Sequence, residues 1–378
     1  MTEHLEPPVT AAKMGARTRL PQLDGLRGVA ILLVVWWHYF NCGFAAQGKW
    51  PWLIEIAEAT DWTWAGVDLF FTLSGFLITG VLLDEAGARN LMPVFYVRRA
   101  ARILPLYWAT LAACAVAWSL IGQDPRFAPL FSHFFPIWSY LTFTQNILMG
   151  RQGFGGKFLG VTWSLAIEEQ FYLVWPWIVR FSRSRRTLGI VCGCLVIAAP
   201  LLRFWGTGLE RFVGTLFRVD SLIFGALAAL IVRNNRASDW ANRLGERKMV
   251  TLAAGMLLLG RNVAHWDILV AWKHSCFGLT SFGILLAATN PASKTAKTLS
   301  FPLLQWFGKI SFALYLTHEV VHGLLFGWLA NRYPAPERLV ALAITASCFL
   351  LSVMLAGISA RWFEPFFLRL GQRCRYQH

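Results

Sequence analysis

Charged residues are scarce in this chain and make up only 15% of its 378 residues, whereas hydrophobic residues make up 56%. A typical soluble domain has about 25% charged residues, because it must cover its surface with polar groups. The mean hydropathy is +0.49 over the whole chain, which excludes a soluble globular protein. The nineteen tryptophans agree with this, since indole rings favour the interface between water and lipid. The composition therefore predicts an all-α, polytopic membrane helix bundle.

Acidic residues are also few, 20 against 35 basic residues, which gives a formal net charge of +15. The basic residues stand in short clusters between apolar runs, and no soluble basic domain remains that would bind nucleic acid. Such clusters are typical of the cytoplasmic connections between membrane spans. We therefore expect the lipid bilayer as the surroundings of this chain and no nucleic-acid partner.

Paired cysteine spacings and a signal peptide are missing as well. The seven cysteines are scattered, mostly within apolar segments, and the closest pair forms a single Cys-x-Cys. We interpret them as small packing residues rather than as a disulfide framework or a metal site. Nothing before Asp24 has the apolar centre of a signal peptide, so the first apolar run is expected to remain as a span.

Long apolar runs are abundant, and each needs about 20 residues to cross the hydrocarbon core. Ten runs qualify as spans, and they begin near Gly28, Gly66, Leu104, Trp163, Leu188, Phe212, Met249, Trp272, Leu303 and Leu339. The apolar stretch from His133 to Gly150 is short. Counting it as a span would place later basic clusters on the outer side, so we interpret it as a re-entrant or interfacial segment that lines a cavity. The prediction is a cytoplasmic tail (1–22), a membrane domain (23–367) and a basic cytoplasmic tail (368–378).

The first span carries two groups that lipid does not tolerate. Arg27 lies at its cytoplasmic end, and His38 follows eleven residues later, a rise of about 16 Å along a helix. This places an imidazole at mid-depth, where it is a candidate general base. The alternative interpretation is a core histidine bonded to a neighbouring carbonyl.

Further polar side chains lie in the next segments. Asp68 and Ser74 belong to the second span, where Ser74 lacks a Gly-x-Ser-x-Gly surrounding and is interpreted as a packing residue. Arg99 and Arg102 share one face of the following helix. Paired guanidinium groups suit phosphate recognition, although they also suit a purely topological role.

The fourth span contains the adjacent carboxylates Glu168 and Glu169. They point about 100° apart on a helix, so we expect one to meet a buried cation and the other to lie nearer the outer water. Arg218 and Asp220, at the outer start of the sixth span, are expected to form an internal ion pair. In the ninth span His318 lies within the bilayer, and the sequence from His318 to His322 also matches the H-E-x-x-H zinc-protease signature through Glu319.

Seven of these segments together resemble the bacterial membrane acyltransferase family 3, which includes O-acetyltransferases of surface polysaccharides, peptidoglycan and macrolides. The matching stretches occur in the family's order, and they are LDGLRGVAILLVVWWHYF, GVDLFFTLSGFLITG, RRAARILPLYW, TWSLAIEEQFYLVWP, FRVDSLIFGALAA, ISFALYLTH and RWFEPFF. They cover roughly residues 23–367. Many members have an additional esterase-like domain after the last span, and this sequence ends without one.

The resemblance implies an acyl-CoA-dependent O-acyltransferase of the bacterial inner membrane. Acetyl-CoA or another acyl-CoA is the expected donor, with no metal, and the acceptor is a carbohydrate, glycolipid or macrolide. It further implies that His38 acts in transfer, that Glu168 or Glu169 orients it, and that Arg27, Arg99 and Arg102 bind the donor's phosphates, with Lys309 as a further contributor. The other residues in matching positions are Asp68, Ser74, Tyr107, Tyr172, Arg218, Asp220 and His318.

Two other functions are compatible with the residues. A proton-coupled transporter would also have buried Arg, Glu and His side chains in about ten spans, although no inverted repeat is evident. An intramembrane zinc protease would use His318, Glu319 and His322, although a third ligand is missing from any motif.

Overall fold

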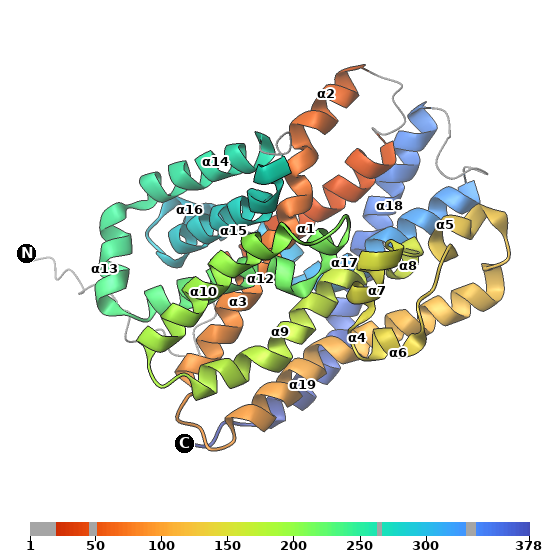
Figure 1. The fold of residues 1–378 in the computed structure, drawn as a ribbon. Coiled ribbons are helices and arrows are strands. Elements are labelled where there is room, and N and C mark those ends of the chain that lie inside the picture. The colour runs from red at the N-terminus through yellow and green to blue at the C-terminus, as the bar shows by residue number, and fades with distance from the viewer. Residues whose placement is uncertain (1–19, 45–50, 263–266, 330–337) are drawn as a thin grey trace, which may run out of the picture.

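The computed structural model describes residues 20–44, 51–262, 267–329 and 338–378, and its regular elements there are all helices (Figure 1). The predicted all-α membrane bundle is therefore confirmed. Most of the expected N-terminal tail lies outside the described residues. Seven helical stretches in the described part are long and apolar enough to cross a membrane, and they are Pro21–Cys42, Trp52–Asp84, Leu91–Ile121, Arg185–Arg203, Glu210–Val232, Pro302–Leu329 and Val340–Arg373.

These stretches contain most of the long helices of the bundle. Their elements are α1 (Pro21–Trp36), α2 (Pro51–Thr60), α3 (Gly66–Asp84), α4 (Leu91–Ile121), α10 (Arg185–Arg203), α11 (Glu210–Val213), α12 (Thr215–Val232), α17 (Pro302–Leu329), α18 (Arg338–Ile358) and α19 (Glu364–Arg373). The remaining longer elements are α9 (Thr162–Phe181), α13 (Asn235–Leu244), α14 (Glu246–Asn262), α15 (Asp267–Thr289) and α16 (Lys294–Leu299).

The predicted number of about ten spans is not confirmed. The three expected spans without a counterpart among the seven coincide with α9, α14 and α15. Glu168 and Glu169 interrupt the apolar sequence of α9. Helix α14 has only 17 residues, whereas a span needs about 20.

Two helix pairs cross at very short distance in the centre of the bundle. A Cβ atom at Gly28 of α1 would lie 2.0 Å from the carbonyl oxygen of Leu304 in α17. A Cβ atom at Gly225 of α12 would lie 1.9 Å from the carbonyl oxygen of Thr72 in α3. Small residues permit this backbone contact, which is how helices pack in a membrane without a hydrophobic driving force. The pairs α1–α17 and α3–α12 therefore form the rigid frame of the bundle.

The segment between α4 and α9 consists of short helices, namely α5 (Ala128–Phe131), α6 (Ile137–Leu141), α7 (Gln145–Gln152) and α8 (Lys157–Gly160). The longest, α7, has eight residues and rises only about 12 Å. None of these four can cross the hydrocarbon core, in agreement with a re-entrant or interfacial segment. Buried side chains hold it in place: Tyr107 Oη donates to the Tyr140 carbonyl at 3.0 Å, and Gln145 Nε2 donates to the Thr162 carbonyl at 3.0 Å.

The expected ion pair between Arg218 and Asp220 is wrong. Arg218 donates to Asp68 of α3 at 2.8 Å, and Asp220 accepts two bonds of 2.6 Å from Arg203 of α10. Residues two apart on a helix point about 200° apart, so the two side chains cannot meet and instead bind different neighbours. All four side chains are almost completely buried. They join α3, α10 and α12 through charges that lipid never contacts.

The C-terminal residues pack against the turn between α3 and α4 (Figure 1). Arg98 donates two hydrogen bonds to the Cys374 carbonyl, at 3.1 and 2.8 Å, and its guanidinium lies 4.6 Å from the centre of the Tyr376 ring. The Arg89 amide donates to the Gln377 carbonyl at 2.8 Å. The basic clusters of residues 89–102 and 369–375 therefore lie on the same side of the bundle.

Candidate active site

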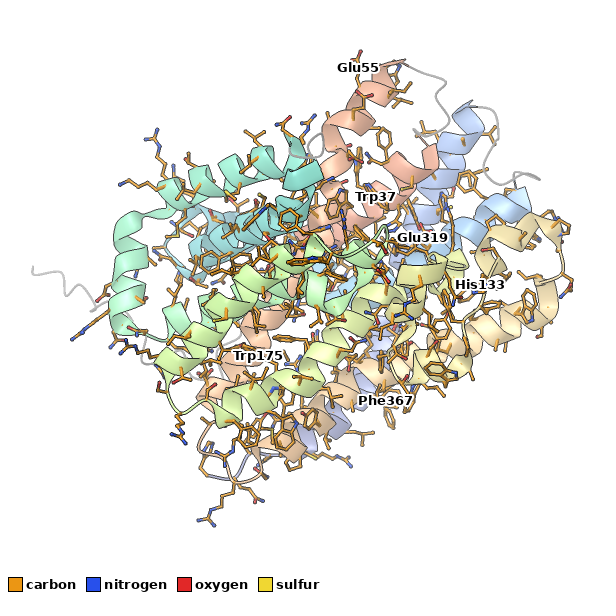
Figure 2. The ribbon with its side chains drawn as sticks, in the orientation of Figure 1. Trp37, Glu55, His133, Trp175, Glu319 and Phe367 are labelled. Carbon is orange, nitrogen blue, oxygen red and sulfur yellow. The ribbon has the colours of Figure 1, made fainter. Side chains whose placement is uncertain are left out.

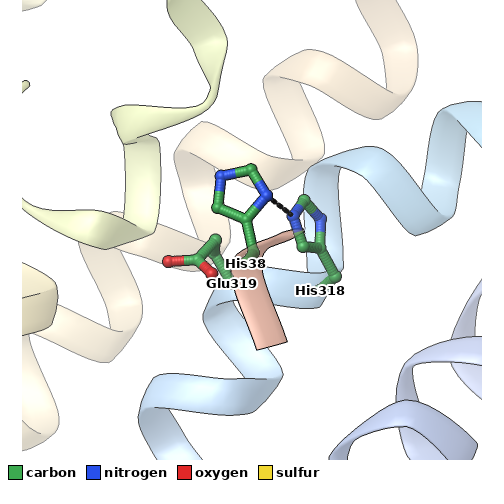
Figure 3. Close-up of side chains that lie close together, drawn as sticks. All are labelled: His38, His318 and Glu319. Atoms are coloured by element: carbon green, nitrogen blue, oxygen red, sulfur yellow. Dashed lines mark hydrogen bonds between the residues drawn. The ribbon is translucent and has the colours of Figure 1, made fainter. Parts of the chain in front are cut away.

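Two histidines from opposite ends of the chain meet inside the bundle. Helix α1 widens into a π-helical segment, Trp37–Phe44, which carries His38. Such wide turns are frequent at functional sites. His318 of α17 faces it, with its Nε2 atom 3.3 Å from Nδ1 of His38 (Figure 3). His318 is fully buried, whereas His38 is half-buried.

Backbone carbonyls fix the tautomer of both rings. Nδ1 of His318 lies 3.1 Å from the Leu314 carbonyl and 2.8 Å from the Tyr315 carbonyl, and both can only accept. The proton of His318 is therefore assigned to Nδ1, which leaves Nε2 as an acceptor. Nδ1 of His38 lies 2.9 Å from the Val34 carbonyl and faces this acceptor. His38 must therefore also be protonated at Nδ1, and its Nε2 has a free lone pair.

One carboxylate lies near the two imidazoles. His38, His318 and Glu319 each offer one ligand atom, and these atoms lie within 4.8 Å of one another (Figure 3). Glu319 is buried in the bundle, whereas Glu55 on α2 lies at its edge and is exposed (Figure 2). The orienting carboxylate was expected to be Glu168 or Glu169. The structure groups Glu319 with the imidazoles instead, a residue that the sequence indicated only through the H-E-x-x-H match.

Tyr39 anchors the α17 side of this group. Its hydroxyl donates to the His318 carbonyl at 2.7 Å and lies 2.8 Å from Oγ of Ser352 in α18. The ring of Tyr39 also stacks on His322, with centres 4.9 Å apart, and His322 packs on Phe326 at 4.5 Å. The second histidine of the H-E-x-x-H match thus lies in an aromatic stack, and His38 occupies the place beside His318 and Glu319.

A second polar region lies at the other end of α1. Arg27, Arg99 and Arg102 line a cavity of about 580 Å³ together with Lys309. Among the described residues, five basic side chains and three carboxylates line it, and one of the five, Arg233, pairs with Asp84 at 2.7 Å. Arg27 has Asp24 3.7 Å away. The cavity therefore has an excess of positive charge and suits an anion with several charges.

The same three arginines also border a smaller cavity. Its polar lining includes Ser74, Glu168, Ser164 and Tyr315. The Tyr315 hydroxyl donates to the Val161 carbonyl at 2.9 Å and lies 2.6 Å from Ser164 Oγ. The backbone carbonyl of Tyr315 is one of the two that hold His318. Tyr315 is thus the link between the arginine cavity and the histidine pair.

Glu168 and Ser74 belong to this cavity rather than to the histidine group. Ser74 donates to Glu168 at 2.5 Å and accepts a bond of 2.9 Å from the Tyr172 hydroxyl. The Arg99 guanidinium lies 5.8 Å from the centre of the Tyr172 ring. Ser74 was interpreted as a packing residue, but it forms the middle of a polar chain beside the arginines. No hydrogen-bond partner is found for Oε1 of Glu169 among the described residues.

Comparison with known proteins gives a consistent result. The model of the acyltransferase family 3, described as an acyltransferase domain, matches residues 20–357. A peptidoglycan O-acetyltransferase of Listeria monocytogenes is 28% identical over 92% of this chain and 56% of its own length. A Bacillus subtilis protein named "Putative peptidoglycan O-acetyltransferase" is 29% identical over 80% of this chain and 48% of its own length. The chain thus spans about half the length of these relatives. No solved structure matches.

Proposed function

This chain is a member of the acyltransferase family 3, and from that premise we propose that it is a membrane-bound O-acyltransferase with His38 as its general base. The proposed donor is acyl-CoA, in the first instance acetyl-CoA, and the proposed acceptor is a hydroxyl group of peptidoglycan, the glycan named for its relatives. The observation that carries the proposal is the histidine pair together with a cavity lined by three arginines and by Tyr315, whose carbonyl bonds His318.

The arginine cavity supports a donor with several phosphates. Guanidinium groups bind phosphate oxygens in pairs, and Arg99 and Arg102 lie one helical turn apart with Arg27 across from them. A coenzyme A anchored there would direct its pantetheine arm into the smaller cavity. Tyr315, which lies one turn before His318, lines that cavity. In this arrangement the thioester approaches the histidine pair from the arginine side.

The transfer itself needs one proton acceptor. Nε2 of His38 takes the proton of the acceptor hydroxyl, and the oxygen attacks the thioester carbonyl. When the tetrahedral intermediate collapses, the carbon–sulfur bond breaks and the thiolate leaves. The proton on His38 then passes to that thiolate. The products are the O-acyl ester and free coenzyme A, and the enzyme returns to its starting state.

The neighbours of His38 suit this role. Its Nδ1–H faces the Val34 carbonyl and His318 Nε2, so the ring keeps its direction while Nε2 gains a proton. Glu319 lies close enough to stabilise the resulting imidazolium, as the carboxylate of a triad does. We propose that Glu168 instead shapes the donor cavity through Ser74 and the arginines that line it.

The test compares membranes that contain the wild type, His38→Ala or the control His133→Ala, whose imidazole is exposed. Each receives acetyl-CoA labelled in its acetyl group, with peptidoglycan precursor as the acceptor. We expect label in the glycan for the wild type and the control, and a loss of about 10²–10⁴-fold for His38→Ala. Equal transfer by His38→Ala would contradict the assignment of the base, and no consumption of acetyl-CoA by any protein would contradict the donor.

A further inference from the structure

The two imidazoles and the carboxylate of the histidine group resemble a metal site, which donor binding does not require. His38, His318 and Glu319 supply two imidazole nitrogens and a carboxylate oxygen, and the three ligand atoms lie within 4.8 Å of one another. This is the set of ligands that Zn²⁺ binds in proteins with two histidines, one glutamate and an open fourth position. We propose that these three residues bind Zn²⁺ and that the bound ion reversibly blocks acyl transfer.

The distance between the two imidazoles fits such an ion. Two nitrogens that bind Zn²⁺ at about 2.0–2.1 Å in tetrahedral geometry lie about 3.3 Å apart. The observed separation of His318 Nε2 and His38 Nδ1 is 3.3 Å. Little rearrangement of the rings is therefore required, and the Glu319 side chain brings its oxygen to the ion from within 4.8 Å of the nitrogens.

The surroundings of His318 match those of a metal ligand. Its Nδ1–H donates to backbone carbonyls, which orients the ring and leaves Nε2 for the metal. The Tyr39 hydroxyl donates to the His318 carbonyl and itself lies 2.8 Å from Ser352 Oγ. Such outer contacts of a histidine are typical of metal sites and strengthen its basicity.

Zinc at this position removes the base without touching Nε2. When Nδ1 of His38 binds the ion, the Nδ1–H bond that was donated to the Val34 carbonyl breaks and a proton is bound at Nε2, so the ring remains neutral overall. Nε2 then holds a hydrogen and can no longer accept the proton of a hydroxyl group. Blocked transfer follows from the change of tautomer, and release of the ion restores the original state.

The ligand set differs from that of the H-E-x-x-H signature. In the signature His318 and His322 bind the metal and Glu319 is the base. Here His322 is stacked between Tyr39 and Phe326. The two sets predict opposite results for two variants, because His38→Ala removes a ligand only from the proposed site and His322→Gln only from the signature.

The binding test uses the full chain in nanodiscs, without donor or acceptor, titrated with Zn²⁺ in a calorimeter. The double variant His38→Ala/His318→Ala defines non-specific binding. We expect about one specific zinc per chain, lost by at least about 100-fold in His38→Ala and in His318→Ala and weakened in Glu319→Gln. His322→Gln and Glu55→Gln are expected to bind like the wild type, and every variant is first shown to elute as the wild type does.

A wild type that binds no specific zinc would overturn the proposal, as would normal binding by His38→Ala together with loss in His322→Gln. Because this measurement contains no acyl donor, it stands even if the proposed donor is wrong. Transfer is then measured with added zinc and after chelation. Inhibition that chelation reverses is expected, and stimulation by zinc would contradict the blocking role.

Discussion

His38 and His318 differ in burial and in hydrogen bonding, and this difference indicates different roles in transfer. His318 is fully buried, with its Nδ1 on two carbonyls, whereas His38 is half-buried and its Nε2 lies on the side of the ring away from His318 (Figure 3). His318 Nε2 is a fixed acceptor for the Nδ1–H group of His38, so it orients the His38 ring. We assign the reactive lone pair to His38 and the orienting role to His318.

The roles of Glu319 and Glu168 are distinguished by the steady-state kinetics of their glutamine variants. Glu319→Gln removes the charge beside the imidazoles, so we expect kcat to fall by about 10-fold or more with little change in the KM for acetyl-CoA. Glu168→Gln changes the cavity of Arg27, Arg99 and Arg102, so we expect mainly the KM to change. Steady-state kinetics in nanodiscs measure both. The reverse pattern would show that Glu168 serves His38, as first expected from the sequence.

At the level of single residues the sequence indicated the polar groups but not their partners. Arg27, His38, Arg99, Arg102 and His318 stand out because ionisable groups inside apolar runs are costly. Glu319 remained without a role in transfer, because 281 positions separate it from His38 and only the packing of α1 on α17 joins them. No spacing rule along one helix reports such a contact.

The helix crossings determine at which level along the bundle His38 and His318 meet. Gly28 lets α1 lie on α17 near Leu304, and this contact aligns His38 with His318 further along the same two helices. The widened turn Trp37–Phe44 changes the direction of the side chains after Trp36. Helix α3 crosses α12 at Gly225 in the same close manner. A π-helical segment was not predicted, since its residues read as ordinary helix.

The crossing of α3 and α12 gives a prediction for stability. Gly225→Val places a side chain against the Thr72 carbonyl, which a Cβ would already approach to 1.9 Å. We expect destabilisation of at least about 1–3 kcal/mol, because an overpacked contact forces the two backbones apart. Gly189→Ala in α10 is the control, since a Cβ there has no atom within 4 Å. Thermal unfolding in detergent, followed by loss of monodisperse protein, measures both, and equal stability would contradict the packing described.

For the whole molecule, apolar composition was sufficient to predict a helical membrane bundle. The number of spans was less predictable: the apolar runs of the sequence indicated ten, whereas seven helical stretches of the described residues are long and apolar enough to cross a membrane. The ion pair of Arg218 was also mispredicted. Arg218 pairs with Asp68, 150 positions away, rather than with its near neighbour Asp220. Partners between helices depend on the packing of the bundle, which the sequence of one span does not contain.

The orientation of the whole molecule is tested with single cysteines. Both termini are expected in the cytoplasm, because the basic clusters lie together beside the C-terminal residues. In intact cells with the outer wall removed, a membrane-impermeant maleimide should label a chain with only Cys42, which is exposed near the outer end of α1. A chain with only Cys374 should react only after permeabilisation. Labelling of Cys374 in intact cells would show that the C-terminal residues face the outside, opposite to the expected topology.

The measurement that tests the central claim most directly separates binding of the donor from transfer. Nanodiscs with the wild type, His38→Ala or Arg99→Gln/Arg102→Gln are assayed for acetyl-CoA binding by equilibrium dialysis and for acetyl transfer from the same samples. His38→Ala should bind acetyl-CoA as the wild type does and transfer about 10²–10⁴-fold less, whereas the arginine variant should bind at least about 10-fold more weakly. Undiminished transfer by His38→Ala, or a wild type that does not bind acetyl-CoA, would contradict the account.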